Sequence, residues 1–258
     1  MKKNSRFPLF VTVAVLIFLY LPIIVLAVNS FNQSRFGSSW AGFSFKWYAL
    51  LFEDDAVWHA LKNSLIVAFS ATITSTIMGA FAAFALYRYK TTWQKVNYSL
   101  IYAPLVVPDL LIGMSLLVFF VALNMHLSLF TIYIAHTTFC LSYVTMVLLA
   151  RLQNFDYSII EAAQDLGASF SFITRKVLIP SLAPGIISAA LLSFTISIDD
   201  YIITSFVAGP GSSTLPIYVY GMIKFGSTPI INALSTLLLI VTFITIFITQ
   251  RLTKSLLT

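Results

Sequence analysis

The chain has 258 residues, of which 59% are hydrophobic and only 9% are charged, and its mean hydropathy is +0.92. Soluble domains carry roughly 25% charged residues, so this composition excludes an ordinary soluble protein and predicts one that lies in a lipid bilayer. The single cysteine, Cys140, excludes an intramolecular disulfide.

Six apolar stretches are long enough to cross a membrane, because a spanning helix needs ~20 mostly apolar residues. We expect an all-α polytopic protein that forms one transmembrane domain over residues 1–258. The first stretch is interpreted as a retained helix, since its apolar core is longer than the ~7–15 residues of a signal peptide. The expected spans are residues 7–28, 61–85, 96–123, 127–150, 182–207 and 232–249.

The 15 basic residues indicate the orientation of these spans. With a cytoplasmic N-terminus, only Arg35, Lys46, Lys62 and Lys224 lie outside. Cytoplasmic loops are enriched in Lys and Arg, so both termini are expected inside. The basic residues then on the inside are Lys2, Lys3, Arg6, Arg88, Lys90, Lys95, Arg151, Arg175, Lys176, Arg251 and Lys254.

Two longer segments follow on the outer side. Residues 29–60 contain Trp40, Trp47, Tyr48, Phe52 and Trp58 among polar residues, which is typical of a segment at headgroup depth or of a docking surface for an external partner. In residues 208–231, Pro216 predicts the start of a short helix over 215–225.

No motif for catalysis or nucleotide binding is present. The three histidines form no HExxH pair, the cysteine has no CxxC partner, and no GxxxxGK[ST] loop occurs. We therefore expect no catalytic residue, no metal site and no cofactor in this chain. If energy drives its work, that energy is expected to enter through a partner or an ion gradient.

Acidic residues inside the apolar stretches are costly, at ~2.5–3.5 kcal/mol on translocon scales, and are functional candidates by default. Asp200 lies on a polar stripe with Ser193, Ser197 and Thr204, at ~100° per residue. Either a role in translocation or interhelical hydrogen bonding explains Asp200, and interhelical pairing is the simpler reading of Asp199.

Asp109 follows Pro108, and Pro104 lies one turn earlier, so the third stretch is expected to kink there and Asp109 to cap the helix that resumes. His136 is interpreted as a buried, hydrogen-bonded histidine rather than a proton relay. The side chains of Asp109, Asp199, Asp200 and Tyr201 are the candidates for a substrate pathway.

A polar segment of about residues 152–181 separates the fourth and fifth stretches. Ser158 and Glu161 have capping-box spacing and predict a helix start, and Gly167 predicts its end. Ser169 is expected to cap a second helix that ends at Pro180. Apolar residues of the first helix would dock into a cytoplasmic partner; they are Ile159, Ile160, Ala162, Ala163 and Leu166.

This segment resembles the EAA loop of ABC importer permeases, whose pattern is EAA-x3-G-x9-I-x-LP. Its matching residues are Glu161, Ala162, Ala163, Gly167, Val177, Ile179 and Pro180, with Val177 and Ile179 as conservative replacements. The resemblance implies a MetI-like type I importer fold with six helices. It also implies that this loop is the coupling helix that inserts into a cleft of the ATPase subunit, and that ATP and Mg²⁺ are bound by that partner.

Further matches run along the chain and are similar to the polyamine branch of this family, the spermidine/putrescine permeases of the PotC type. They include 29–32, 46–48, 85–89, 108–109, 193–195 with 199–200, 205–207 and 232–234. The resemblance implies a PotA-like ATPase dimer, a PotB-like second permease and a PotD-like periplasmic binding protein as partners in a bacterial inner membrane. Two alternatives stay open: a permease of this fold for another solute, such as iron, thiamine or a phosphorus compound, and an ATP-independent secondary transporter.

Overall fold

The computed structural model describes residues 7–35, 39–89, 93–225 and 229–257, with side chains up to residue 244. Within these ranges the chain is helical apart from one isolated bridge between Asn32 and Phe43. The chain forms two compact units, Met1–Trp58 with Val219–Thr258, and His59–Tyr218. Several basic positions used above for orientation lie outside the described residues or side chains, namely Lys2, Lys3, Arg6, Lys90, Arg251 and Lys254.

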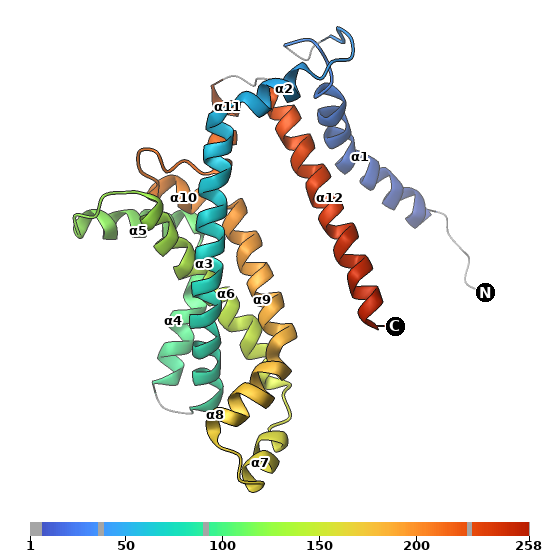
Figure 1. Cartoon of the computed structure of the whole chain (residues 1–258). Helices are drawn as coiled ribbons and strands as arrows, with labels where there is room; N and C mark the ends of the chain where they lie inside the picture. The colour runs from blue at the N-terminus through green and yellow to red at the C-terminus, as the bar shows by residue number, and fades with distance from the viewer. Residues whose placement is uncertain (1–6, 36–38, 90–92, 226–228, 258) are drawn as a thin grey trace. The chain divides into compact units, whose positions relative to one another are not determined.

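The first unit contains α1 (Phe7–Asn29), α2 (Lys46–Glu53) and α12 (Ile230–Leu257), and α12 packs against both of the others (Figure 1). The side chain of Asn32 forms hydrogen bonds within the segment between α1 and α2. Its side-chain amide donates to the Ser39 carbonyl at 2.8 Å, and its side-chain oxygen accepts from the Ala41 N–H at 3.0 Å. The indole N–H of Trp47 donates to the Asn32 carbonyl at 2.7 Å, so hydrogen bonds hold the described part of this loop in a defined conformation.

The second unit is organised around α6 (Leu129–Gln153), which packs most extensively against α9 (Ile179–Asp199) and also against α4 (Gln94–Val106). Most of α3 (Asp55–Arg88) belongs to this unit and runs along it in Figure 1. The short α10 (Ile202–Val207) packs against α5 (Asp109–Ala122). Helix α11 (Leu215–Lys224) begins where Pro216 predicted it.

The core of this second unit has two parts that follow the length of α6. One surrounds Phe120, Ile132 and Ile203 near the start of α6. The other surrounds Leu148, Leu152 and Ile160 near its end, and it joins the spans to the polar segment that follows α6. Within a bilayer such residues stabilise the fold by van der Waals packing rather than by removal from water, because lipid tails are as apolar as the side chains.

Four helical segments of the described chain are long and apolar enough to cross a membrane: α1, α3, α6 and the continuous stretch Phe170–Asp199. A fifth is obtained if α4 and α5, which are bent by 112° relative to each other, form one broken span. The apolar part of α12 with described side chains, Ile230–Ile244, is shorter. The prediction of a polytopic all-helical membrane protein is therefore confirmed, with four to five candidate spans among the described residues.

The predicted fifth span differs in its bounds. We expected residues 182–207 to form one helix, but the helix begins at Phe170, ends at Asp199, and is followed by the separate helix α10. Pro180 does not stop it, because a π-helical turn over Thr174–Leu178 precedes the proline. The Ile179 N–H donates to the Thr174 carbonyl five residues back, and a widened turn of this kind relieves the clash of a proline ring with the preceding turn.

Candidate functional site

The polar segment after α6 folds into a short helix, α7 (Ser158–Asp165), which lies at one end of the second unit together with α8 (Phe170–Ile173) (Figure 1). The predicted capping box is not formed, since no side chain of the N-cap residue Tyr157 caps the helix. Instead the Asp156 carboxylate accepts a hydrogen bond from the Ser158 N–H at 3.0 Å. The Ser158 hydroxyl and N–H together hold the pKa of Asp156 below its ordinary value.

Gly167 ends α7 as predicted. Its φ of +79° lies in the left-handed region, where residues with a side chain are disfavoured. The Gly167 N–H donates to the Gln164 carbonyl at 2.8 Å and the Ala168 N–H donates to the Ala163 carbonyl at 3.0 Å. This pair of bonds is the Schellman arrangement, which satisfies the last carbonyls of a helix.

The next helix is also capped as predicted, because the Ser169 hydroxyl accepts from the Phe172 N–H at 3.3 Å. Since α8, the π turn and α9 are continuous, the loop between spans is shorter than residues 152–181. Val177 and Pro180 therefore lie within the start of the next span, while Glu161, Ala162, Ala163 and Gly167 lie in or just after α7.

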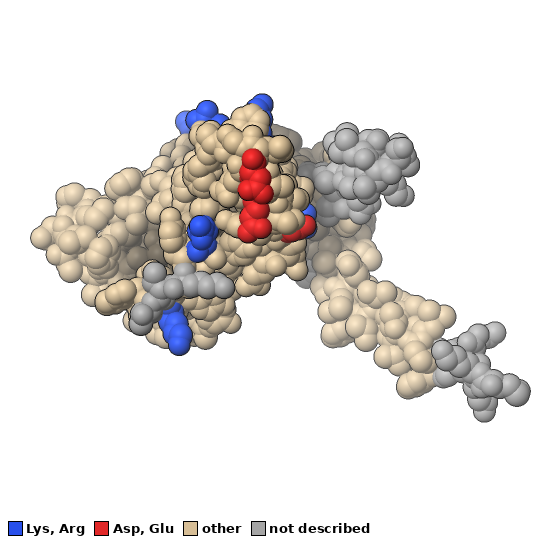
Figure 2. All heavy atoms as spheres, turned by 90° about the horizontal axis from the view of Figure 1, so that it is seen from below, with Lys and Arg blue, Asp and Glu red and all other residues tan. Residues whose placement is uncertain are grey.

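The two faces of α7 differ. Ile160 is buried in the core near the end of α6 and Ala163 packs against that core, which corrects the expectation that both side chains are free to dock. Ile159, Ala162 and Leu166 are exposed, and Leu166 has 89% of its side chain exposed. Figure 2, which looks at the end that carries α7, shows a row of acidic side chains with basic ones around it. The exposed acids of this segment are Asp156, Glu161 and Asp165.

The break before Asp109 is present, with α4 ending at Val106 and α5 starting at Asp109. The predicted cap is not formed, because Pro108 occupies the N-cap position and no side-chain hydrogen bond caps the helix. Asp109 is exposed in the first turn of α5, where a carboxylate interacts favourably with the helix dipole.

The chain breaks a second time at Asp200 and Tyr201, between α9 and α10. The Asp200 carboxylate accepts hydrogen bonds from the Ile203 N–H at 3.3 Å, the Thr204 N–H at 2.8 Å and the Thr204 hydroxyl at 2.6 Å. It therefore caps α10. Asp199, the last residue of α9, is exposed.

His136 of α6 connects both sides of this break. Its Nδ1 lies 2.7 Å from the Ser197 hydroxyl of α9, and its Nε2 lies 2.8 Å from the Thr204 hydroxyl of α10 and 3.4 Å from the Asp200 carboxylate. Only 1% of the side chain is exposed, which agrees with the prediction of a buried, hydrogen-bonded histidine. The link from His136 to Ser197 and Thr204 was missed, because residues 61 and 68 positions apart leave no local signal.

The chain matches the model of the family described as "Binding-protein-dependent transport system inner membrane component" over residues 75–256. The chain belongs to this family. It is thus a multi-pass inner membrane permease of an ABC importer, which works with a binding protein, and ATP is bound by the partner ATPase and not by this chain.

Several curated relatives match over nearly the whole chain. It is 41% identical over 242 residues to the spermidine/putrescine transport system permease protein PotC of Escherichia coli strain K12, covering 93% of this chain and 91% of the relative. It is 42% identical over 248 residues to the putrescine permease PotI of the same strain, covering 92% and 88%. A putative 2-aminoethylphosphonate permease, PhnV of Salmonella paratyphi A, is 28% identical and covers 95% and 93%.

Solved structures share the fold. A bacterial ABC transporter that imports alginate matches with a TM-score of 0.74 at 18% identity, covering 97% of this chain and 98% of that one. The MetNI methionine ABC transporter in an inward-facing conformation matches with a TM-score of 0.62 at 18% identity, covering 83% and 99%. The expected likeness to type I importer permeases is confirmed at the level of the fold.

Proposed function

We propose that this permease forms, with a PotB-like second permease, the pathway by which spermidine or putrescine enters the cytoplasm. The observation that carries the proposal is an identity of 41% and 42% to two polyamine permeases over more than nine-tenths of the chain. A PotA-like ATPase dimer would supply ATP hydrolysis, and a PotD-like periplasmic protein would deliver the polyamine. The chain would act as one domain over residues 1–258, with six spans and both termini cytoplasmic.

The α7 segment is proposed as the coupling helix. Its exposed Ile159 and Leu166 offer an apolar surface to a groove of the ATPase, and its Schellman turn at Gly167 fixes the direction of the chain after it. Transmission to the membrane would be direct, because the continuous helix Phe170–Asp199 begins a few residues later. The residues assigned to this coupling are Glu161, Ala162, Ala163, Gly167, Val177 and Pro180.

The coupling proposal is tested with Gly167→Asp and Glu161→Lys. Both variants are expected to insert in the membrane but to lose uptake while ATP hydrolysis by the assembled transporter continues. Lys95→Glu, at an exposed position at the start of α4 and outside the α7 segment, serves as the control and should leave uptake unchanged. Normal uptake in the Gly167 and Glu161 variants contradicts the assignment.

Acidic and aromatic groups suit a polycation that crosses an apolar barrier, because they attract it by Coulomb forces and cation–π contact. We assign the pathway to Asp200 and Tyr201 first, then to Asp199 and Asp109. Asp200→Asn is expected to slow uptake more than Asp109→Asn, because it removes the negative charge of the first candidate for attracting the polycation. Unchanged uptake in Asp200→Asn would show that Asp200 has only a structural role.

The substrate is tested by uptake in cells that lack their own polyamine importers and carry this chain with its neighbouring subunits. Radiolabelled spermidine, putrescine and 2-aminoethylphosphonate are offered in turn, with an otherwise identical strain that lacks only this chain as the control. ATP-dependent uptake of a polyamine supports the proposal. Uptake of the phosphonate alone favours the second candidate, to which the 28% identical relative points.

A further inference from the structure

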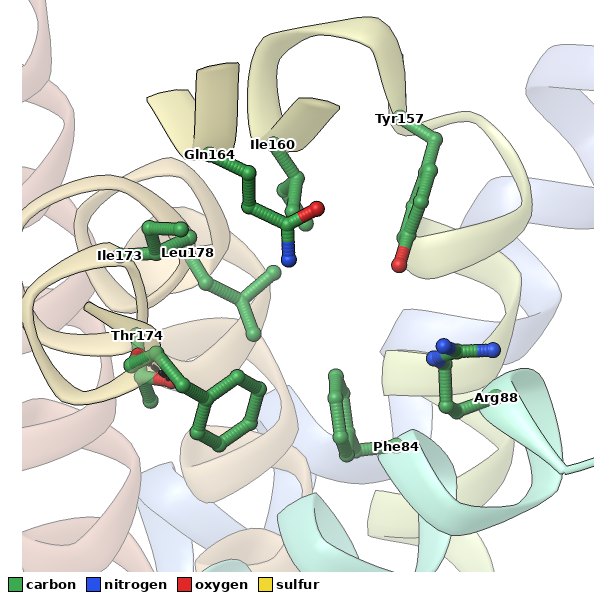
Figure 3. Close-up of a pocket in the computed structure, with 9 residues that line it drawn as sticks. Phe84, Arg88, Tyr157, Ile160, Gln164, Ile173, Thr174 and Leu178 are labelled. Atoms are coloured by element: carbon green, nitrogen blue, oxygen red, sulfur yellow. Dashed lines mark hydrogen bonds between the residues drawn. The ribbon is translucent and has the colours of Figure 1, made fainter. Parts of the chain in front are cut away.

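A hollow lies between the end of α3 and the segment that follows α6, apart from the pathway candidates. Its walls are mostly apolar and come from α3, α7, α8 and the π turn. Figure 3 shows the labelled side chains around it. The lining residues are Phe84, Arg88, Tyr157, Ile160, Gln164, Phe170, Ile173, Thr174 and Leu178.

Besides Thr174, whose hydroxyl donates to the Phe170 carbonyl at 2.9 Å, three polar side chains line this apolar space. In Figure 3 the amide of Gln164 and the hydroxyl of Tyr157 are directed into the hollow, and Arg88 lies at its rim beside Phe84. Within the described ranges, no ion pair or side-chain hydrogen bond joins any of the three to another residue. The lining contains no carboxylate. All three groups can donate hydrogen bonds, so the hollow is suited to a ligand with an acceptor-rich anionic part and an apolar part.

The position of the hollow along the spans limits what this ligand can be. Arg88 is the last residue of α3, and Phe170 begins the continuous helix Phe170–Asp199, so two candidate spans have an end at this hollow. Arginines near span ends lie at headgroup depth. Basic pockets between spans on the cytoplasmic side bind acidic headgroups, and the cytoplasmic leaflet supplies anionic lipids.

The two faces of α7 separate this hollow from the surface assigned to the ATPase. Ile160 and Gln164, four residues apart, share the face that lines the hollow. Ile159, Glu161 and Leu166 are exposed and do not line it. A ligand in the hollow would therefore contact the core-facing side of α7 and leave its other side free for the ATPase.

We propose that this hollow binds the headgroup of an anionic phospholipid, with the phosphate on Arg88, Tyr157 and Gln164 and the apolar part against Phe84 and Phe170. Only the consequence for transport rests on the proposed function. A lipid bound between α3 and α7 would keep the coupling helix in the position in which it contacts the ATPase. Binding of the lipid itself does not depend on which solute is carried.

The test is retention of phosphatidylglycerol by the purified, fully assembled transporter, measured by native mass spectrometry after reconstitution into phosphatidylcholine with and without phosphatidylglycerol. Arg88→Gln is expected to weaken retention about tenfold, because a hydrogen-bonded charge contact is worth about 1.5 kcal/mol or more. Lys95→Gln is the matched control, since Lys95 is exposed near the start of α4, at the cytoplasmic side, and does not line the hollow. Tyr157→Phe, which removes one hydroxyl only, is expected to weaken retention less and covers the case in which Arg88→Gln does not assemble.

Three outcomes overturn the proposal. Equal retention in Arg88→Gln, Tyr157→Phe and Lys95→Gln means that the lipid binds elsewhere. If inorganic phosphate displaces phosphatidylglycerol, the hollow is a site for free phosphate and not for a lipid headgroup. If the ATPase alone, without the lipid, protects an Ile160→Cys probe from thiol reagents, a side chain of the ATPase fills the hollow. Loss of polyamine uptake with normal lipid retention would instead affect only the proposed function.

Discussion

At the scale of single residues, His136 shows how a polar side chain can organise the interior of a span. The Thr204 hydroxyl donates to the Asp200 carboxylate, so its oxygen is left to accept from Nε2–H of His136. The other ring nitrogen, Nδ1, is paired with the Ser197 hydroxyl. One imidazole thus joins α6 to both helices at the break after Asp199.

His136→Ala should destabilise the folded permease strongly. The change leaves the Ser197 and Thr204 hydroxyls without their partner in a buried place, and an orphaned buried polar group costs about 1–3 kcal/mol. We expect a lower midpoint of thermal unfolding for the assembled transporter in detergent. His126→Ala, at an exposed position before α6, is the control and should leave the midpoint unchanged; equal midpoints for the two variants would contradict the role given to His136.

Asp156 gives the start of α7 a dependence on pH. Its pKa is lowered in the folded state by the Ser158 hydroxyl and N–H, so its contribution is fully present above the unfolded value of about 3.9 and is lost as pH falls through the lower, folded pKa. Hydrogen exchange of a peptide covering residues 156–165 should therefore accelerate on acidification, beyond the intrinsic change.

The controls for Asp156 are two substitutions and a second peptide. Asp156→Asn keeps a capping oxygen and removes the titration, so its protection should not depend on pH in this range. Asp156→Ala should lack the protection at every pH, and a peptide from α6 should stay protected in all three proteins. The same pH response in wild type and Asp156→Asn would show that another group titrates.

At the scale of elements, two broken spans meet. Helix α5 follows the break at Pro108, α10 follows the break at Asp200, and the two pack closely against each other. Gly113 permits this approach, because a Cβ there would lie 2.7 Å from Cδ2 of Phe206 and 3.2 Å from Cα of Ile203. A contact with a backbone atom at this distance cannot be relieved by turning a side chain alone.

Gly113→Ala should separate α5 from α10 and cost about 1–3 kcal/mol, as overpacking does in other interiors. Its control is Gly221→Ala in α11, where a Cβ would meet nothing within 4 Å and where alanine favours the helix by about 0.5–1 kcal/mol. Thermal unfolding of the assembled transporter should fall for the first variant and stay equal or rise for the second. A neutral Gly113→Ala would mean that α5 and α10 move apart easily.

The elements also show which features the sequence could predict. Apolar length located α1, α3 and α6, and local capping chemistry located the Schellman turn at Gly167 and the start of α8 at Ser169, because both kinds of signal lie within a few residues. The continuity of the helix through Pro180 was not predictable, since it depends on a π turn, and no characteristic residue pattern marks such a turn in the sequence. The pairing of His136 with Ser197 and Thr204 requires the packing of α6 on α9 and α10, which no single segment encodes.

At the scale of the whole molecule, the orientation in the membrane is the property on which the coupling and the lipid site both depend. The positive-inside bias predicts that α7 lies in the cytoplasm and that the loop between α1 and α2 lies outside. The chain suits a direct labelling test, because its only cysteine, Cys140, has no exposed side-chain surface and is a silent background.

Leu166→Cys and Phe43→Cys place one reactive thiol at each predicted side. Their native side chains are 89% and 62% exposed, so a membrane-impermeant maleimide should reach both once the membrane is opened. In intact spheroplasts only Phe43→Cys should be labelled, and in inside-out vesicles only Leu166→Cys. The wild-type chain should stay unlabelled in both preparations. Labelling of Leu166→Cys from the outside would reverse the topology, and α7 would then be out of reach of a cytoplasmic ATPase and Arg88 remote from the cytoplasmic leaflet.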